Sequence, residues 1–179
     1  MAEKTRVLVG YATEAGSTAG IAERIAATLG NRDVDVTCRL LGPDLDPAAF
    51  DALVVGSAVH NMAWLRPALD FLARVPNTGD RPTWCFSVGG VAPHGLLTRR
   101  LTSGEARKVE RGFPSAFRAR EHRVFGGVVD MSGLPLWGKA IWRLIGGRPG
   151  DHRDWPAIQA WADEIGTALP ACAWRADGP

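Results

Sequence analysis

Short apolar runs alternate along this chain with stretches in which apolar residues recur every three or four positions. The apolar runs predict five buried β-strands, at 5–11, 34–40, 52–58, 82–88 and 123–129. The helical spacing predicts four helices, from about Ser17 to Leu29, around Trp64–Leu72, from about Ser103 to Arg111, and from about Trp155 to Leu169. Gly30 ends the first helix, and Asp154 followed by Pro156 is typical of a helix start.

Strands that alternate with helices predict an α/β domain built on a parallel sheet with helices on both faces. The length of 179 residues and the lack of a long linker favour a single domain over 1–179. Ligands of such sheets bind beyond the carboxyl ends of the strands. We therefore expect function in the loops that follow the first, third and fourth strands.

The first of these loops carries hydroxyl groups and a glycine directly before a helix. It reads Tyr-Ala-Thr-Glu-Ala-Gly-Ser-Thr over residues 11–18, and Gly16 permits a tight turn. The free N–H groups of a helix start and its partial positive charge favour a phosphate there. The loop is neither a Walker loop nor a G-x-G-x-x-G dinucleotide loop. Simple N-capping of the helix by Ser17 or Thr18 is the alternative.

The segment TEAGST, residues 13–18, resembles the FMN phosphate loop of flavodoxins, Thr/Ser-x-Thr-Gly-x-Thr. Ala15 departs from that pattern and removes one hydroxyl donor, worth about 1 kcal/mol as a net hydrogen bond. The resemblance covers nearly the whole chain. It implies FMN as cofactor and a flavodoxin-like three-layer sandwich, whose five-stranded parallel sheet has the order 2-1-3-4-5. The implied contacts in this loop are Thr13, Glu14, Ala15, Gly16, Ser17 and Thr18.

Two further loops fit the same resemblance. Residues 56–64 resemble the flavodoxin loop that wraps one face of the flavin ring, so that Trp64 or His60 would stack on the ring. The alternatives are a core position for Trp64 and an exposed loop position for His60. After the fourth strand, two glycines at 89–90 would let a planar ring approach backbone amides. The contacts predicted from both loops are Ser57, Ala58, Val59, His60, Asn61, Trp64, Ser87, Val88, Gly89, Gly90, His94 and Gly95.

Residues 131–153 predict a basic amphipathic insertion before the last helix. Over 134–148, Trp137, Ile141 and Ile145 share one helical face, whereas Lys139 and Arg143 lie on the opposite side. Such a helix packs on its own domain, on a second subunit, or at a membrane interface. This segment resembles the menaquinone-dependent protoporphyrinogen oxidase branch of flavodoxin-like proteins. That branch implies a quinone acceptor reached at the membrane and oxidation of a porphyrinogen.

Cysteine usage and charge exclude several classes of protein and of binding partner. Three widely spaced cysteines, at 38, 85 and 172, exclude a disulfide framework and the usual zinc spacing. The net charge is +2, but residues 99–123 hold eight Lys/Arg against three Asp/Glu, a patch suited to an acidic partner, an anionic membrane surface or a solvated helix face. Since no nucleic-acid-binding motif accompanies this patch, we expect no nucleic-acid partner. With no signal-peptide or membrane-spanning run, we expect a cytoplasmic protein, in peripheral contact with the inner face of the membrane if 134–148 binds lipid.

These features favour an FMN-dependent oxidoreductase that passes electrons between a reduced substrate, such as protoporphyrinogen, and an acceptor such as a quinone. No side chain is assigned as a catalytic acid or base, and the oligomeric state is not indicated. The alternative is a non-enzymatic electron carrier that docks on a redox partner. Carrier flavodoxins are typically acidic, and a pI near 8.6 argues against that role. A third hypothesis is a regulatory domain that has lost FMN, for which Ala15 would be the cause.

Overall fold

The computed structural model describes residues 4–75, 81–89, 106–129 and 150–169. Its main sheet has five parallel strands: β1 (Thr5–Ala12), β2 (Val34–Leu40), β3 (Ala52–His60), β5 (Thr83–Gly89) and β6 (Glu121–Gly126). Their spatial order is β2-β1-β3-β5-β6. The predicted order 2-1-3-4-5 is therefore confirmed, because β5 and β6 are the fourth and fifth of the predicted strands.

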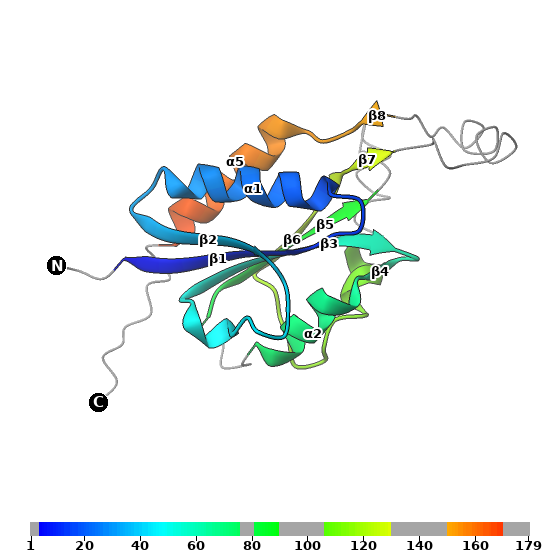
Figure 1. Ribbon diagram of the computed structural model, residues 1–179, viewed down its shortest axis with the longest axis horizontal. Coiled ribbons are helices and arrows are strands. Elements are labelled where there is room, and N and C mark those ends of the chain that lie inside the picture. Colours follow the sequence, from blue (N-terminus) through cyan, green and yellow to red (C-terminus); the bar gives the residue numbers. More distant parts are fainter. Residues whose placement is uncertain (1–3, 76–80, 90–105, 130–149, 170–179) are drawn as a thin grey trace, which may run out of the picture.

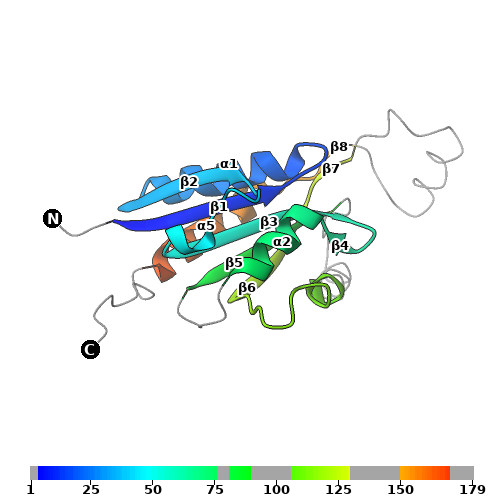
Figure 2. The same ribbon diagram turned by 60° about the horizontal axis from the view of Figure 1, so that its bottom comes forward.

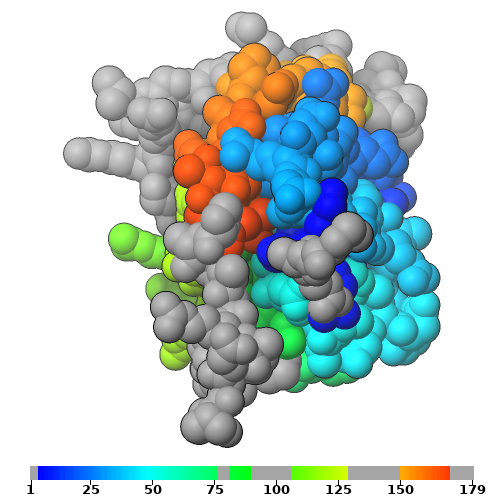
Figure 3. All heavy atoms as spheres, turned by 90° about the vertical axis from the view of Figure 1, so that its left-hand side faces the viewer, coloured from blue at the N-terminus to red at the C-terminus, as the bar shows by residue number. Residues whose placement is uncertain are grey.

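Helices cover both faces of this sheet, as the sequence predicts (Figure 1). Helices α1 (Ser17–Gly30) and α5 (Trp155–Ala168) pack side by side on one face, and Figure 3 shows them adjoining at one end of the molecule. The other face carries α2 (Arg66–Arg74), a short 3-10 helix η1 (Pro47–Ala49) and the helical residues 106–110 (Figure 2). The result is a three-layer α/β sandwich.

The alternation of side chains along the strands divides the core into two clusters. Val7 and Val9 point toward α1 and α5, whereas Leu8 between them points toward α2. In β3, residues 52–57 are all buried, which confirms that a continuous apolar run marks a strand covered on both faces. The edge strand β2 is only half-buried, and among the described strands none pairs with its outer side.

Two predicted boundaries are wrong, and both errors concern the carboxyl edge of the sheet. The second helix begins at Arg66 rather than near Trp64, because Trp64 belongs to β4 (Ala63–Trp64), which folds back antiparallel onto β3. The strand predicted at 123–129 divides at Gly127. Beyond that residue, β7 (Val128–Val129) leaves the main sheet and pairs antiparallel with β8 (Gly150–Asp151).

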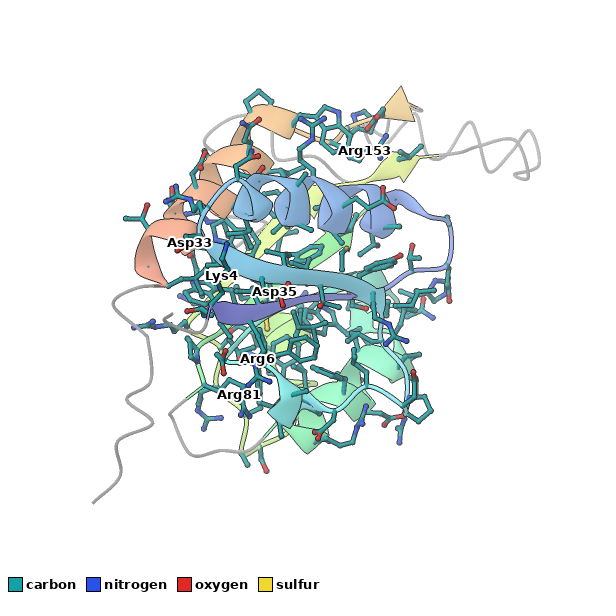
Figure 4. The ribbon with its side chains drawn as sticks, turned by 60° about the vertical axis from the view of Figure 1, so that its left-hand side comes forward. Lys4, Arg6, Asp33, Asp35, Arg81 and Arg153 are labelled. Carbon is teal, nitrogen blue, oxygen red and sulfur yellow. The ribbon has the colours of Figure 1, made fainter. Side chains whose placement is uncertain are left out.

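Ion pairs gather at the opposite, amino-terminal edge. Lys4 Nζ lies 2.7 Å from Asp33 Oδ1, and Arg6 Nη2 lies 3.2 Å from Asp51 Oδ1. Figure 4 shows Lys4, Arg6 and Asp33 around the start of β1, whereas Arg153 lies beyond α1, away from them. The carboxyl edge, where β1, β3 and β5 end next to one another, is thus the edge at which the predicted loops meet.

Candidate functional site

The β1–α1 loop forms the first part of the site, and its turn depends on Gly16. This residue has φ +83 and precedes the first turn of α1. Its N–H donates to Thr13 Oγ1 at 3.0 Å, which closes the turn. The first N–H groups of α1 have no intrahelical acceptor, and the first intrahelical bond runs from Gly20 N to Gly16 O at 3.3 Å. Backbone donors therefore converge on the space outside the loop.

Thr18 places a buried hydroxyl in the same first turn. The residue is completely buried, and among the described side chains its Oγ1 is a buried oxygen without a hydrogen-bond partner. A buried hydroxyl left unpaired costs free energy, so such groups in folded proteins are usually hydrogen-bonded. Glu14, Ala15 and Gly16 are exposed and Ser17 is half-buried. The turn, the free N–H groups and the unpaired hydroxyl together fit a bound phosphate.

The second predicted loop is a β-hairpin rather than an open loop. Val59 pairs with Trp64 and His60 pairs with Ala63, so the turn consists of Asn61 and Met62. Both turn residues have positive φ, 51 and 62, as the two-residue turn favoured by twisted hairpins requires. His60 is exposed, and its Nδ1 lies 3.7 Å from Glu14 Oε2. The hairpin therefore lies beside the β1–α1 loop. We call this loop, residues 13–18, the phosphate-type loop.

Trp64 is not placed to stack on a flavin ring, and that prediction is corrected. Its side chain is buried, and its ring packs against Phe113 at a centroid distance of 4.6 Å. Its Nε1 donates to Ser87 Oγ at 2.7 Å. Ser57 is also occupied within the fold, because its hydroxyl accepts from Leu65 N at 3.0 Å and donates to Ala58 O at 2.8 Å. Trp64 is a core residue, whereas His60 remains the exposed ring of this region.

The third loop begins at the end of β5, beside the hairpin. Ser87 pairs with Ser57 and Val88 with Ala58 across the sheet, so the ends of β3 and β5 meet. Ser87 and Val88 are buried, and the Ser87 hydroxyl points into the α2 side of the core. Gly89 is partly exposed, and a Cβ there would meet no atom within 4 Å. Among the described residues, none therefore covers its Cβ side, while Gly90, His94 and Gly95 lie outside the described residues.

Gly127 is a site residue that the sequence reasoning missed. Its N–H donates to Gly89 O at 2.8 Å, and a Cβ on it would lie 2.9 Å from Val88 Cγ1 and 3.3 Å from Ser17 Oγ. Only a glycine fits this contact between the phosphate-type loop and the end of β5. The Gly-Gly pair within the predicted fifth strand was the available signal, since glycine within a strand often marks a bulge or a close backbone approach.

Arg153 brings a positive charge to the outer side of α1. Its guanidinium stacks on Trp155 at 4.5 Å, and Nη2 lies 2.6 Å from Asp151 Oδ2. The hydrogen bond from Arg153 lowers the pKa of the Asp151 carboxyl to about 2, which keeps it ionised at neutral pH. A Cβ at Gly20 would lie 2.7 Å from Arg153 Nη1, which places the guanidinium against α1 one turn beyond the phosphate-type loop. The predicted insertion at 131–153 otherwise lies largely outside the described residues.

Beneath the third loop, Ser87 belongs to a chain of hydrogen bonds that the sequence did not reveal and that runs from the buried Trp64 ring out to the exposed Glu110. Its Oγ lies 2.8 Å from His122 Nε2, and His122 Nδ1 lies 3.0 Å from Glu110 Oε1. Ser87 accepts the Trp64 N–H, so its own hydrogen can go to Nε2 while Nδ1–H donates to the carboxylate. Burial lowers the pKa of His122, although Glu110 opposes that change. The imidazole is therefore held neutral, with every polar atom paired.

This buried histidine predicts a loss of stability in mild acid. Below its ordinary pKa of 6.5 the unfolded chain protonates His122, whereas the native protein does so only at lower pH. The free energy of unfolding should therefore fall as pH drops from about 7.5 to about 5, and fall less in a His122→Gln protein. Urea unfolding at each pH measures the two slopes. His60→Gln, on the exposed hairpin, controls for losing a histidine, and equal slopes in wild type and His122→Gln would contradict the expectation.

Comparison with known proteins identifies the domain. A family model described as a flavodoxin domain matches residues 8–154. This chain belongs to the flavodoxin domain family. FMN is accordingly the cofactor of this domain. No curated protein matches the sequence significantly.

Solved structures agree on the fold. A flavodoxin from the domain Archaea has 15% identity and a TM-score of 0.53, with 92% of this chain and 99% of that one covered. Flavodoxin 2 from Bacillus cereus has 20% identity and a TM-score of 0.54, with 92% and 99% covered. The rubredoxin oxygen:oxidoreductase of Desulfovibrio gigas has 16% identity and a TM-score of 0.56 over 93% of this flavodoxin domain. The domain spans only 36% of that oxidoreductase.

Proposed function

We propose that this flavodoxin domain is an FMN-dependent oxidoreductase that passes electrons between a reduced substrate and an acceptor such as a quinone. The observation that carries the proposal is the unpaired, fully buried Thr18 hydroxyl beside the free N–H groups of α1. Bound FMN supplies the electron transfer, and the chain supplies binding and orientation. FMN-based transfer to a redox partner is what the family has in common; the substrate and the acceptor belong to the proposal.

Each loop at the carboxyl edge of the sheet would contact a different part of FMN. Thr18, Ser17 and the first N–H groups of α1 would hold the phosphate, with the Thr13–Gly16 bond fixing the turn. The backbone at Gly89, open on its Cβ side, would receive the planar ring. His60 on the hairpin would flank that ring from the side of Glu14. These contacts would exclude water from the ring without any side chain acting as a catalytic acid or base.

Thiol chemistry is not favoured at the described cysteines. Burial raises the pKa of Cys38 to about 11, with Glu23 adding to the shift. Burial also raises the pKa of Cys85, which is completely enclosed. Reactive cysteines need a lowered pKa and access to solvent, and neither residue has both. This supports a flavin rather than a protein thiol as the redox group.

The resemblance to the protoporphyrinogen oxidase branch suggests a more specific proposal, in which the substrate is a porphyrinogen and the acceptor is a quinone. The resemblance rests on residues 125–165, and its amphipathic part at 134–148 lies outside the described residues. Within the part of the chain that the structure describes, no helix is long and apolar enough to cross a bilayer. A porphyrinogen substrate, a quinone acceptor, peripheral membrane contact and a cytoplasmic location thus remain proposals. Steady turnover of reduced FMN-protein by a soluble quinone such as menadione would favour the enzyme over the carrier, for which only transfer to a protein partner is expected.

Replacing Thr18 by valine tests the proposal, because its two effects differ in sign. Valine keeps the shape but removes an unpaired buried hydroxyl, so the apo-protein should be as stable or up to about 1 kcal/mol more stable. FMN affinity should fall about tenfold or more, since a hydrogen bond to a charged group is lost. FMN titration by fluorescence quenching and urea unfolding measure the two quantities.

Thr28→Val is the matched control. Thr28 is buried in the same helix, but its Oγ1 donates to Arg24 O at 2.9 Å, far from the loop. Thr28→Val should leave FMN affinity unchanged. If Thr18→Val bound FMN as tightly as Thr28→Val, the assignment of the phosphate site would be wrong. If wild type itself bound no FMN, the regulatory hypothesis, with Ala15 as its cause, would replace the oxidoreductase.

A further inference from the structure

The α2 side of the protein contains a second concave region that the FMN site does not use. It is a cavity of about 600 Å³, lined by residues of the segment 110–122 between the helical residues 106–110 and β6. Its volume lies in the range of small-molecule sites. Its wall includes His122, whose ring is hydrogen-bonded to Ser87, a residue of strand β5. The cavity is therefore separate from the phosphate-type loop but shares a buried neighbour with the end of β5.

The charges around this cavity favour an anion. Arg111, Arg118 and Arg120 line it together with two glutamates. Glu121 is neutralised inside the protein, since Oε1 lies 2.6 Å from Arg123 Nε and Oε2 accepts the Trp161 N–H at 3.0 Å. Glu110 is engaged by His122 at 3.0 Å. The Arg120 guanidinium lies over the Trp84 ring at 5.6 Å, so the lining cations available to a ligand are those of Arg111 and Arg118. They stand against one carboxylate, that of Glu110, which already has an internal partner.

The donor capacity of Arg111 and Arg118 is only partly used within the described structure. Arg118 directs Nη1 to the carbonyl groups of Ser115 and Phe117, at 2.9 and 2.8 Å. No described residue hydrogen-bonds to its Nε or Nη2. Arg111 is exposed, and no described residue forms an ion pair or hydrogen bond with its guanidinium. A planar guanidinium with open donors is suited to bind a carboxylate through two parallel hydrogen bonds.

Aromatic rings supply the apolar part of the same cavity. Phe113 and Phe117 both line it, with their centroids 5.8 Å apart in an edge-to-face arrangement. Phe117 is buried and Phe113 packs on Trp64, so both rings are fixed by the core. Rigid rings beside open cationic donors recognise a flat apolar body that bears a negative group.

We propose that this cavity binds a small aromatic carboxylate, with Arg111 and Arg118 holding the carboxylate and the rings of Phe113 and Phe117 contacting the aromatic body. The site does not depend on the proposed oxidoreductase function. The Glu110–His122–Ser87 chain would connect its occupant to the strand that ends beside the FMN site.

Fluorine NMR titration of the full chain with para-fluorobenzoate tests this inference, in the presence of excess FMN. Para-fluorobenzoate should bind, and para-fluorobenzyl alcohol, of similar shape but uncharged, should bind at least about tenfold more weakly. Arg111→Gln should weaken benzoate binding about tenfold, because it removes a charge-assisted hydrogen bond. Arg118→Gln should weaken benzoate binding by a similar factor. Because Arg118 also donates to two carbonyl groups of the segment 110–122, its replacement could alter that segment, and Arg111→Gln then still tests the proposal.

Arg66→Gln is the matched control, since Arg66 is exposed on α2 and pairs with Asp70 at 2.9 Å. Equal losses of benzoate affinity in Arg66→Gln and Arg111→Gln would mean that binding depends only on the net charge of the protein, and would overturn the proposed site. Equal binding of the acid and the alcohol would overturn it as well. Benzoate that binds only when FMN is left out would belong to the FMN site, and no binding of benzoate in either condition would also overturn the proposal.

Discussion

Gly16→Val is expected to reduce FMN affinity by about a hundredfold or more while leaving the fold intact. Gly16 has φ +83, and this left-handed conformation is a genuine outlier for a β-branched residue. The protein can respond only by changing the turn, which would break the bond between Gly16 N and Thr13 Oγ1 and misalign the first N–H groups of α1. A Cβ at this position would meet no atom of the described residues within 4 Å, so the described core is not disturbed.

FMN titration together with far-ultraviolet circular dichroism measures both halves of this prediction. Gly30→Val is the matched control, because Gly30 ends the same helix, has no positive φ, and also has open space around its Cβ position. It should bind FMN like wild type. Unaltered FMN affinity in Gly16→Val would show that the β1–α1 turn does not hold the phosphate.

Trp161→Ala is expected to lower the free energy of unfolding by about 3–5 kcal/mol. Trp161 is a residue of α5 and is completely buried against the sheet, with its ring 5.5 Å from that of Phe125 and 6.2 Å from that of Phe86. Its N–H also ties α5 to Glu121 at the start of β6. Alanine would leave a large cavity and an unpaired carboxylate oxygen, and helices around a rigid sheet refill such space only in part.

Urea unfolding of the apo-protein tests this value, with Trp155→Ala as control. Trp155 lies in the same helix but is only partly buried, and its ring contacts the guanidinium groups of Arg153 and Arg24 at its surface. Its replacement should cost distinctly less than that of Trp161. Equal costs for the two tryptophans would indicate that packing at the α5–sheet interface does not dominate stability.

The fold was predictable because its evidence is local. The apolar runs of β1, β3 and β5 and the four-residue spacing in α1 are visible within single windows, and alternating strands and helices permit few topologies. The start of α5 was likewise readable, because Asp154 accepts the Ala157 N–H at 3.0 Å as an N-cap. The hairpin between β3 and β4 was missed since Asn61-Met62 lacks the glycine that usually marks such turns.

The candidate site was predictable where one loop forms it, and not where distant segments meet. Gly16 and Thr18 lie within one short motif, and the structure gives Gly16 a positive φ and leaves the Thr18 hydroxyl buried and unpaired, which fits the predicted loop. The pairing of Ser87 with His122 joins residues 35 positions apart, and no local pattern distinguishes it from chance. Trp64 was misassigned for the same reason, because the Phe113 ring that covers it comes from a distant segment.

The small sheet of β7 and β8 holds together the two points between which residues 130–149 are inserted. Val129 pairs with Gly150, so the chain leaves and re-enters the domain at neighbouring points, whatever lies between them. In modular terms, this pair of short strands fixes the two attachment points, at Val129 and Gly150, next to each other, and this spacing does not depend on the length of chain that joins them.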